Sequence, residues 1–192
     1  MIRLFIKGTS MKHLLSIFLL FMSTGAFPNE NPQILMDTSE GQIIIELYPQ
    51  RAPKTVANFL EYVQKDGFKQ TTFHRVINNF MIQGGGFAAS GKPAPTFTAV
   101  ENESKNGLSN KRGTVAMART NAPHSATRQF FINHKDNDFL DAQDNNWGYS
   151  VFGKVSKGMN VIDKIAAVKT GAGDKPLQDI IINKIALIAA KK

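Results

Sequence analysis

Residues 73–87 read Phe-His-Arg-Val-Ile-Asn-Asn-Phe-Met-Ile-Gln-Gly-Gly-Gly-Phe, and they guide the interpretation of the whole chain. Apolar and polar residues alternate with a period of two on both sides of Asn78-Asn79. This alternation predicts two half-buried strands joined by a turn. In the first strand it places Phe73, Arg75 and Ile77 on one face of the sheet.

The second strand of this hairpin mixes apolar side chains with polar ones that a strand would normally turn toward water. Met81 and Gln83 share a face, and three glycines follow them. An arginine and a glutamine among Phe and Met side chains indicate a concave apolar surface with a few directed donors, which is typical of a ligand site. A surface hairpin with one solvated Arg75 is the alternative, and this stretch alone does not decide between the two.

The rest of the chain predicts a mainly β protein with two helices. Runs rich in β-branched and alternating residues predict strands at Gln33–Thr38, Gln42–Leu47, Gly113–Arg119, Gln129–Asn133, Tyr149–Val155 and Asp179–Ala189. Apolar residues at a spacing of about 3.6 predict helices at Ala52–Lys65 and Gly158–Val168. A parallel sheet would need a helix at every crossover, so the strands indicate an antiparallel barrel.

Two long polar segments and one short one interrupt this pattern. Ala88–Leu108 is rich in Pro, Gly and Asn and predicts a loop, whose length is more typical of a functional segment than of an idle one. Asp136–Trp147 also predicts a loop, although it carries the apolar pair Phe139-Leu140, which is either a buried anchor or a ligand contact. Gly171–Pro176 is only a weak echo of a phosphate-binding loop and predicts a turn.

The amino terminus has the three-part layout of a secretory signal. Basic residues precede an apolar run at 14–22, and small residues follow it, with Ala26 as the expected last residue before cleavage. This run is shorter than the roughly 20 residues that span a bilayer, and a buried first helix is the alternative. The expected division of the chain is a cleaved signal peptide at 1–26, with 1–10 as an upstream extension if translation starts at Met11, a linker at 27–32 and one domain at 33–190.

Composition excludes several classes of function. The chain contains no cysteine, which excludes disulfides, thiol catalysis and Cys-ligated zinc. Loss of residues 1–26 removes three basic residues and no acidic one, which lowers the formal net charge from +8 to +5. The remaining Lys and Arg residues are scattered without a basic block, so nucleic-acid binding has little support.

Metal and covalent chemistry also lack a motif. His74, His124 and His134 remain after processing, and none lies at metal-ligand spacing with another ligand. His74 lies on the strand face opposite Arg75, and a hydrogen-bonded core histidine is a simpler interpretation than a catalytic one. We expect no metal and no cofactor. If the chain is an enzyme, it neither makes nor breaks a covalent bond, and Arg75 suits that role because a guanidinium stays charged and presents several donors in a fixed fork.

Four motifs together resemble the cyclophilin family of peptidyl-prolyl cis-trans isomerases. They lie at residues 73–85, 113–119, 125–133 and 151–155, and the resemblance extends from about Gln33 to Ile188. It implies a closed eight-stranded antiparallel barrel, capped by two α-helices, that binds proline-containing peptides in a groove on its outer face. Residues 117–120 and 129–133 resemble the bacterial, exported branch. That likeness agrees with the signal and implies a periplasmic isomerase that assists the folding of unfolded exported proteins.

The same resemblance implies a role for each residue of the groove. Arg75 takes the place of the catalytic arginine, and we expect Gln83 to orient its guanidinium. The implied proline pocket consists of Phe80, Met81, Phe131 and Leu140. The implied rim of the groove consists of Gln83, Gln129, Ala118, Arg119, Phe139 and Tyr149, with Ala118 and Arg119 where the substrate backbone pairs.

Three positions depart from the pattern of many eukaryotic members, which carry Trp, His and Asn where this chain has Phe139, Tyr149 and Arg119. Phe139 lacks the indole N–H that such members offer to cyclosporin, so we expect cyclosporin to bind weakly at best. Trp147 is near in sequence but is not the matching position. The rival interpretation is a proline-peptide binding module or holdase, which would tolerate loss of Arg75 and Gln83. We expect a monomer that does not bind membranes once the signal is removed.

Overall fold

A computed structural model describes residues 31–188 of the chain, so the expected signal peptide and residues 27–30 of the expected linker lie outside the described residues. The strands are β1 (Gln33–Thr38), β2 (Gly41–Leu47), β3 (Thr71–Ile77), β4 (Met81–Ala88), β5 (Thr114–Met117), β6 (Phe130–Asn133), β7 (Val151–Lys157) and β8 (Ile181–Leu187). The helices are α1 (Pro53–Gln64) and α2 (Met159–Ala166), with short 3-10 helices η1 (Asp138–Leu140) and η2 (Ala172–Asp174).

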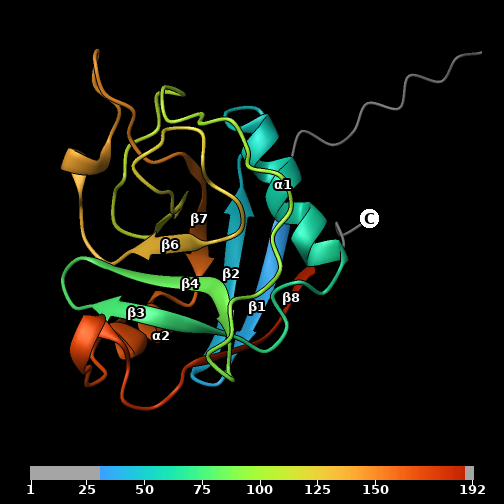
Figure 1. The fold of residues 1–192 in the computed structure, drawn as a ribbon, viewed down its shortest axis with the longest axis vertical. Coiled ribbons are helices and arrows are strands. Elements are labelled where there is room, and N and C mark those ends of the chain that lie inside the picture. Colours follow the sequence, from blue (N-terminus) through green and yellow to red (C-terminus); the bar gives the residue numbers. More distant parts are fainter. Residues whose placement is uncertain (1–30, 189–192) are drawn as a thin grey trace, which may run out of the picture.

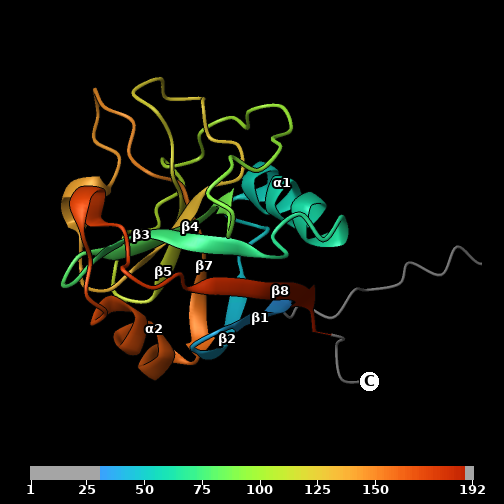
Figure 2. The same cartoon turned by 60° about the horizontal axis from the view of Figure 1, so that its bottom comes forward.

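The strands close into one barrel whose hydrogen-bonded order is β1-β2-β7-β5-β6-β4-β3-β8. Every pairing around this ring is antiparallel. The two α-helices lie at opposite ends of the barrel (Figures 1 and 2). Closure removes the exposed sheet edges that would otherwise pair with other chains. The prediction of a closed eight-stranded antiparallel barrel with two helices is confirmed.

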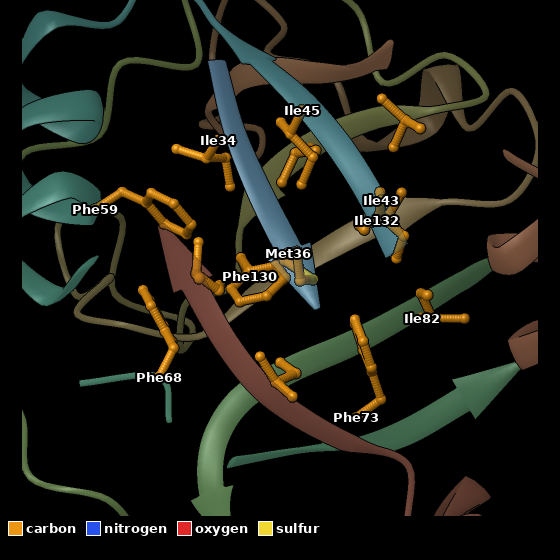
Figure 3. Close-up of a cluster of buried hydrophobic side chains, with 14 of the residues drawn as sticks. Ile34, Met36, Ile43, Ile45, Phe59, Phe68, Phe73, Ile82, Phe130 and Ile132 are labelled. Atoms are coloured by element: carbon orange, nitrogen blue, oxygen red, sulfur yellow. The ribbon is translucent and has the colours of Figure 1, made fainter. Parts of the chain in front are cut away.

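A cluster of aromatic side chains packs α1 against the barrel interior (Figure 3). Phe59 on α1 is 1 % exposed, and its ring centroid lies 5.7 Å from that of Phe130 and 5.1 Å from that of Phe152. Gly85 lets this cluster close, because its φ is +80° and a Cβ there would lie 2.9 Å from the rings of Phe68 and Phe130. The close packing of these rings therefore explains why β4 carries glycine at this position.

A β-bulge in β3 corrects one prediction about the faces of this strand. Phe73 pairs with Gly84 and Arg75 pairs with Gln83, so β3 advances by two residues while β4 advances by one. Such an extra residue switches the side that the following side chains face. As a result Phe73 lies in the barrel core, whereas Arg75 lies on the outer face. The prediction that Phe73 and Arg75 share a face is wrong.

The long segment 88–108 is a loop, as predicted, and its described contacts stabilise α1. The N-cap residue of α1, Ala52, makes no side-chain hydrogen bond. Glu103 replaces it, because its carboxylate accepts from the Lys54 amide at 3.1 Å, the Thr55 amide at 2.8 Å and the Thr55 hydroxyl at 2.7 Å. A helix amino terminus leaves such amides unpaired, and an acceptor there stabilises the helix.

The second long segment, 136–147, is not entirely a loop, because η1 lies within it. Phe139 in η1 is 67 % exposed, and no residue of this short helix is buried. The interpretation of Phe139-Leu140 as a buried anchor is therefore wrong.

No helix in the part of the chain that the structure describes is both long enough and apolar enough to cross a membrane.

Candidate functional site

A pocket of about 350 Å³ lies on the outer face of the barrel. The alternation of side chains along the strands explains its position. Ile82 and Ile132 belong to the barrel core, whereas their neighbours Met81 and Phe131 belong to a separate cluster outside it. The pocket is lined by Arg75, Phe80, Met81, Gln83, Ala118, Arg119, Phe131, Leu140 and Tyr149. All nine were predicted as site residues, so the structure brings together most of the predicted groove.

The floor of the pocket is apolar and closely packed. Met81 and Phe131 are 3 % and 4 % exposed. The ring of Tyr149 meets that of Phe131 edge to face, with the centroids 5.6 Å apart. Phe80 and Leu140 are partly buried and pack against the same cluster. The pocket therefore accepts a compact apolar group without burying the rest of the molecule that carries it.

Two buried asparagines fix the backbone of the pocket's rim. Asn137 Nδ2 donates to the Phe80 carbonyl at 2.9 Å, and the Asn137 carbonyl accepts from the Leu140 amide at 2.9 Å. Asn110 Nδ2 donates to the Tyr149 carbonyl at 3.4 Å. Both asparagines are fully buried. Sequence reasoning missed these two residues, because a lone Asn in a polar loop gives no signal of burial.

Arg75 is one of two arginines that line the pocket, and its ion-pair partner was not predicted. Its Nε donates to Asp174 Oδ2 at 3.2 Å, and the two side chains are 43 % and 45 % exposed. No hydrogen bond joins Arg75 to Gln83 among the described residues, although the two face each other in the β3–β4 register. The expectation that Gln83 orients the guanidinium therefore has no hydrogen bond to support it here and stays a prediction.

Gln83 instead belongs to a polar pair at the edge of the pocket. Its Nε2 donates to Gln129 Oε1 at 2.8 Å. Gln129 was also predicted as a site residue, but it does not line the pocket. Its side chain contacts the pocket lining through the hydrogen bond with Gln83. A Cβ on Gly86 would lie 2.5 Å from Gln129 Cδ, which shows how closely the main chain approaches this pair.

Arg119 forms another wall of the pocket, and main-chain carbonyls hold its side chain there. Its Nε donates to the Gly148 carbonyl at 3.1 Å and its Nη1 to the Thr120 carbonyl at 2.9 Å. The guanidinium carbon lies 4.8 Å from the centroid of the Tyr149 ring, in cation–π geometry. The neighbouring Ala118 amide donates to the Gln129 carbonyl at 2.9 Å, which ties this wall to β6.

Phe139 lies outside the pocket lining and extends its rim. Its ring stacks on Phe80 with the centroids 5.7 Å apart. Trp147 also lies outside the lining, and its ring packs edge to face on His124 at 4.9 Å. Neither Trp147 nor His124 lines the pocket, and the sequence analysis gave Trp147 no role in the groove.

His74 is half-buried on the outer side of the barrel, where its ring packs against Phe87 at 4.7 Å. Burial lowers the pKa of this imidazole and outweighs the opposing contributions of Thr72 and Gln129, while the nearby Arg75 charge lowers it slightly further. Its Nδ1 is buried without a hydrogen-bond partner. The interpretation as a core histidine with satisfied hydrogen bonds is therefore only partly right. Among the described residues no group of three His, Cys, Asp or Glu side chains could hold a metal ion.

Comparison with known proteins shows which family the chain matches. The model of the family described as "Cyclophilin type peptidyl-prolyl cis-trans isomerase/CLD" matches residues 33–187. The chain is 50 % identical over 160 residues to a peptidyl-prolyl cis-trans isomerase (cyp18) of Streptomyces antibioticus, covering 80 % of this chain and 96 % of that one. It is also 50 % identical over 159 residues to peptidyl-prolyl cis-trans isomerase B of Escherichia coli, covering 79 % and 97 %.

A solved structure extends the comparison to the fold. The crystal structure of a cyclophilin-type isomerase of Cryptosporidium parvum, determined in the presence of the dipeptide Ala-Pro, superposes with a TM-score of 0.70 at 27 % identity. The superposition covers 82 % of this chain and 99 % of that one. The match therefore extends over most of this chain and nearly all of the Cryptosporidium parvum protein.

Proposed function

The chain belongs to the cyclophilin family of peptidyl-prolyl cis-trans isomerases, and we propose that it isomerises X-Pro bonds of exported proteins at the pocket around Arg75. Its activity is that of a peptidyl-prolyl cis-trans isomerase. The observation that carries the assignment to this pocket is the placement of the half-exposed guanidinium of Arg75 beside a compact apolar floor. That combination can hold a proline ring and act on the bond that precedes it.

The chemical problem is rotation about a partial double bond. Resonance between the prolyl nitrogen and the preceding carbonyl gives a barrier of about 18–20 kcal/mol. As the bond twists, the nitrogen regains its lone pair and becomes a hydrogen-bond acceptor. A donor placed there stabilises the twisted state and neither planar state, and only such differential binding accelerates the reaction.

Arg75 is that donor in our proposal. A hydrogen bond from a charged group contributes about 1.5–3 kcal/mol, and each 1.4 kcal/mol or so changes the rate about tenfold. One arginine can thus supply about one to two powers of ten. The remaining acceleration comes from fixing the proline ring against Phe80, Met81, Phe131 and Leu140 while the preceding carbonyl swings. The step needs no metal and no cofactor.

The proposed substrates are proline-containing peptides and unfolded exported proteins. The Cryptosporidium parvum relative crystallised in the presence of Ala-Pro supports this substrate class. The signal-like residues 1–26 support export to the periplasm, with cleavage after Ala26. We further propose a monomer that binds cyclosporin weakly at best and binds neither nucleic acid nor membranes after cleavage.

The activity is tested by NMR measurement of cis/trans exchange in a short Ala-Pro peptide, with the wild-type protein beside Arg75→Ala. We expect fast exchange that falls at least about tenfold in the variant, because one charged donor is lost. The affinity for the peptide should remain nearly the same, since the apolar floor is intact. Peptide binding without any acceleration by the wild type would favour the binding-module interpretation instead.

Export is tested separately, by expressing the full chain with a carboxy-terminal tag in a Gram-negative host. We expect the tagged protein in the periplasmic fraction, with a mass that corresponds to a first residue at Phe27. An Ala26→Arg variant is the matched control, because a small residue is required before the cleavage site. Recovery of the wild type in the cytoplasm with its amino terminus intact would refute export.

A further inference from the structure

Asp174 holds the guanidinium of Arg75 from the side, although 99 residues separate the two in sequence. It lies in η2, and both views place this red-orange turn beside β3 (Figures 1 and 2). The carboxylate accepts a hydrogen bond from the Nε–H of Arg75. Among the described residues, neither terminal nitrogen of Arg75 has a hydrogen-bond partner, so both remain available to a ligand in the pocket.

The turn that carries Asp174 is itself fixed. Two main-chain hydrogen bonds join the segments on either side of the turn. The Gly171 amide donates to the Lys175 carbonyl at 2.8 Å, and the Leu177 amide donates to the Lys169 carbonyl at 3.0 Å. Asp174 has a φ of +60°, a left-handed conformation that Asp and Asn tolerate better than most residues. The carboxylate is thus presented to Arg75 from a preset backbone rather than from a freely moving arm.

We propose that Asp174 is a positioning residue for Arg75: it fixes the guanidinium through Nε so that the terminal nitrogens donate to the twisting prolyl bond. This inference rests on the proposed function of the pocket. Gln83 donates to Gln129, and no hydrogen bond joins it to Arg75 among the described residues. The ion pair therefore takes over the orienting role that the sequence assigned to Gln83.

A negative charge beside Arg75 has two opposing effects. It orders the guanidinium, and it also weakens the positive potential that a substrate meets. Because both side chains are nearly half exposed, water and salt screen the second effect strongly. The geometric effect is not screened, since it depends on where the donors point. The ordering of the Arg75 guanidinium therefore outweighs the partial neutralisation of its charge, and removal of the Asp174 carboxylate should slow the reaction.

The test compares Asp174→Asn with Asp179→Asn in the purified protein. Asn tolerates the left-handed backbone at position 174, so this change leaves the turn intact and replaces the carboxylate by a neutral amide, which is a weaker acceptor for the Arg75 Nε–H. Asp179 is exposed and lies between the same turn and β8, so it is a control for the same change of charge. An ion pair this exposed contributes at most about 1 kcal/mol, which corresponds to about fivefold in rate.

We expect Asp174→Asn to lower the maximal exchange rate of the Ala-Pro peptide by about two- to fivefold, with peptide affinity unchanged. The Arg75 Nε–H signal should shift in this variant and stay in place in Asp179→Asn, a change that a purely structural role of the turn would not produce. Asp174→Gly keeps the left-handed backbone, lacks the carboxylate, and should show the same loss if Asp174→Asn folds poorly.

The outcomes separate this inference from the function on which it rests. If Asp174→Asn and Asp174→Gly isomerise as fast as the wild type or faster, while Arg75→Ala is slow, Asp174 does not position Arg75 and the inference is overturned. If Arg75→Ala is as fast as the wild type, the proposed function of the pocket itself fails. Equal losses in Asp174→Asn and Asp179→Asn would also overturn the inference, because charge alone would then explain them.

Discussion

Replacing Glu103 by alanine removes the carboxylate that caps α1 from the loop 88–108. Two main-chain amides, those of Lys54 and Thr55, lose their acceptor at the helix amino terminus, and the buried Thr55 hydroxyl loses its partner. Loss of a side-chain cap costs about 0.5–2 kcal/mol. Loss of a negative charge at this end of the helix dipole costs a further 0.3–1 kcal/mol or so.

These contributions predict that Glu103→Ala lowers the free energy of unfolding by about 1–3 kcal/mol. For a domain of this size, each kcal/mol lowers Tm by about 2–4 °C. We therefore expect Tm to fall by about 2–12 °C in a reversible thermal melt followed by circular dichroism. The reference is Glu101→Ala on the same loop, because Glu101 pairs with Lys54 on the surface, where both side chains are more than half exposed.

An exposed pair of this kind contributes about 0–1 kcal/mol, so Glu101→Ala should change Tm little. The two variants remove the same functional group two residues apart, and they differ in whether the carboxylate meets the helix end. Equal values of Tm for Glu103→Ala and Glu101→Ala would refute the argument that the loop stabilises α1 through this cap. Peptidyl-prolyl isomerisation should be unaffected in both variants, because neither residue lines the pocket.

Two further predictions concern pH and cyclosporin. Burial lowers the pKa of His74 below its ordinary value of about 6.5. The unfolded chain therefore binds this proton more tightly, and the stability that neutral His74 contributes is complete above about pH 6.5 and is lost as the pH falls below it. His74→Gln should lose less unfolding free energy than the wild type between about pH 7.5 and pH 5.5 in urea titrations; equal losses would contradict this assignment. Phe139→Trp adds an indole N–H at the exposed rim and should tighten cyclosporin binding about fivefold, the value of one hydrogen bond of about 1 kcal/mol. Calorimetric titration measures it, and nanomolar binding by the wild type would contradict the role given to Phe139.

The strands were predictable from a local pattern, and the residues of the groove were assigned through the resemblance to the cyclophilin family, with which the same pattern agrees. Residues that alternate along a strand must face opposite sides of the sheet, so Met81 and Phe131 had to lie outside if Ile82 and Ile132 lay inside. Helix ends were predictable for a similar reason, since Pro53 suits only the first turn of a helix. These signals involve near neighbours in sequence, which is why no structure was needed to find them.

The features that escaped prediction all join segments that are distant in sequence. The Arg75–Asp174 pair spans 99 residues and the Glu103 cap spans 48, and neither has a local pattern. The bulge between Phe73 and Arg75 depends on how β3 meets β4, so the strand's own alternation does not reveal it. Buried asparagines such as Asn137 escaped for the converse reason, because polar loop residues are normally exposed.

The bulge has a consequence for the origin of the site. Without the extra residue in β3, strict alternation from the buried Phe73 would turn Arg75 into the barrel core, where an unpaired guanidinium would be strongly destabilising. The bulge moves Arg75 to the outer face and brings Val76 into the core beside Phe73. Stability and activity therefore depend on different sides of the same strand. A single irregularity in the strand pairing lets a charged group stand beside an apolar pocket without disturbing the packing that holds the barrel together.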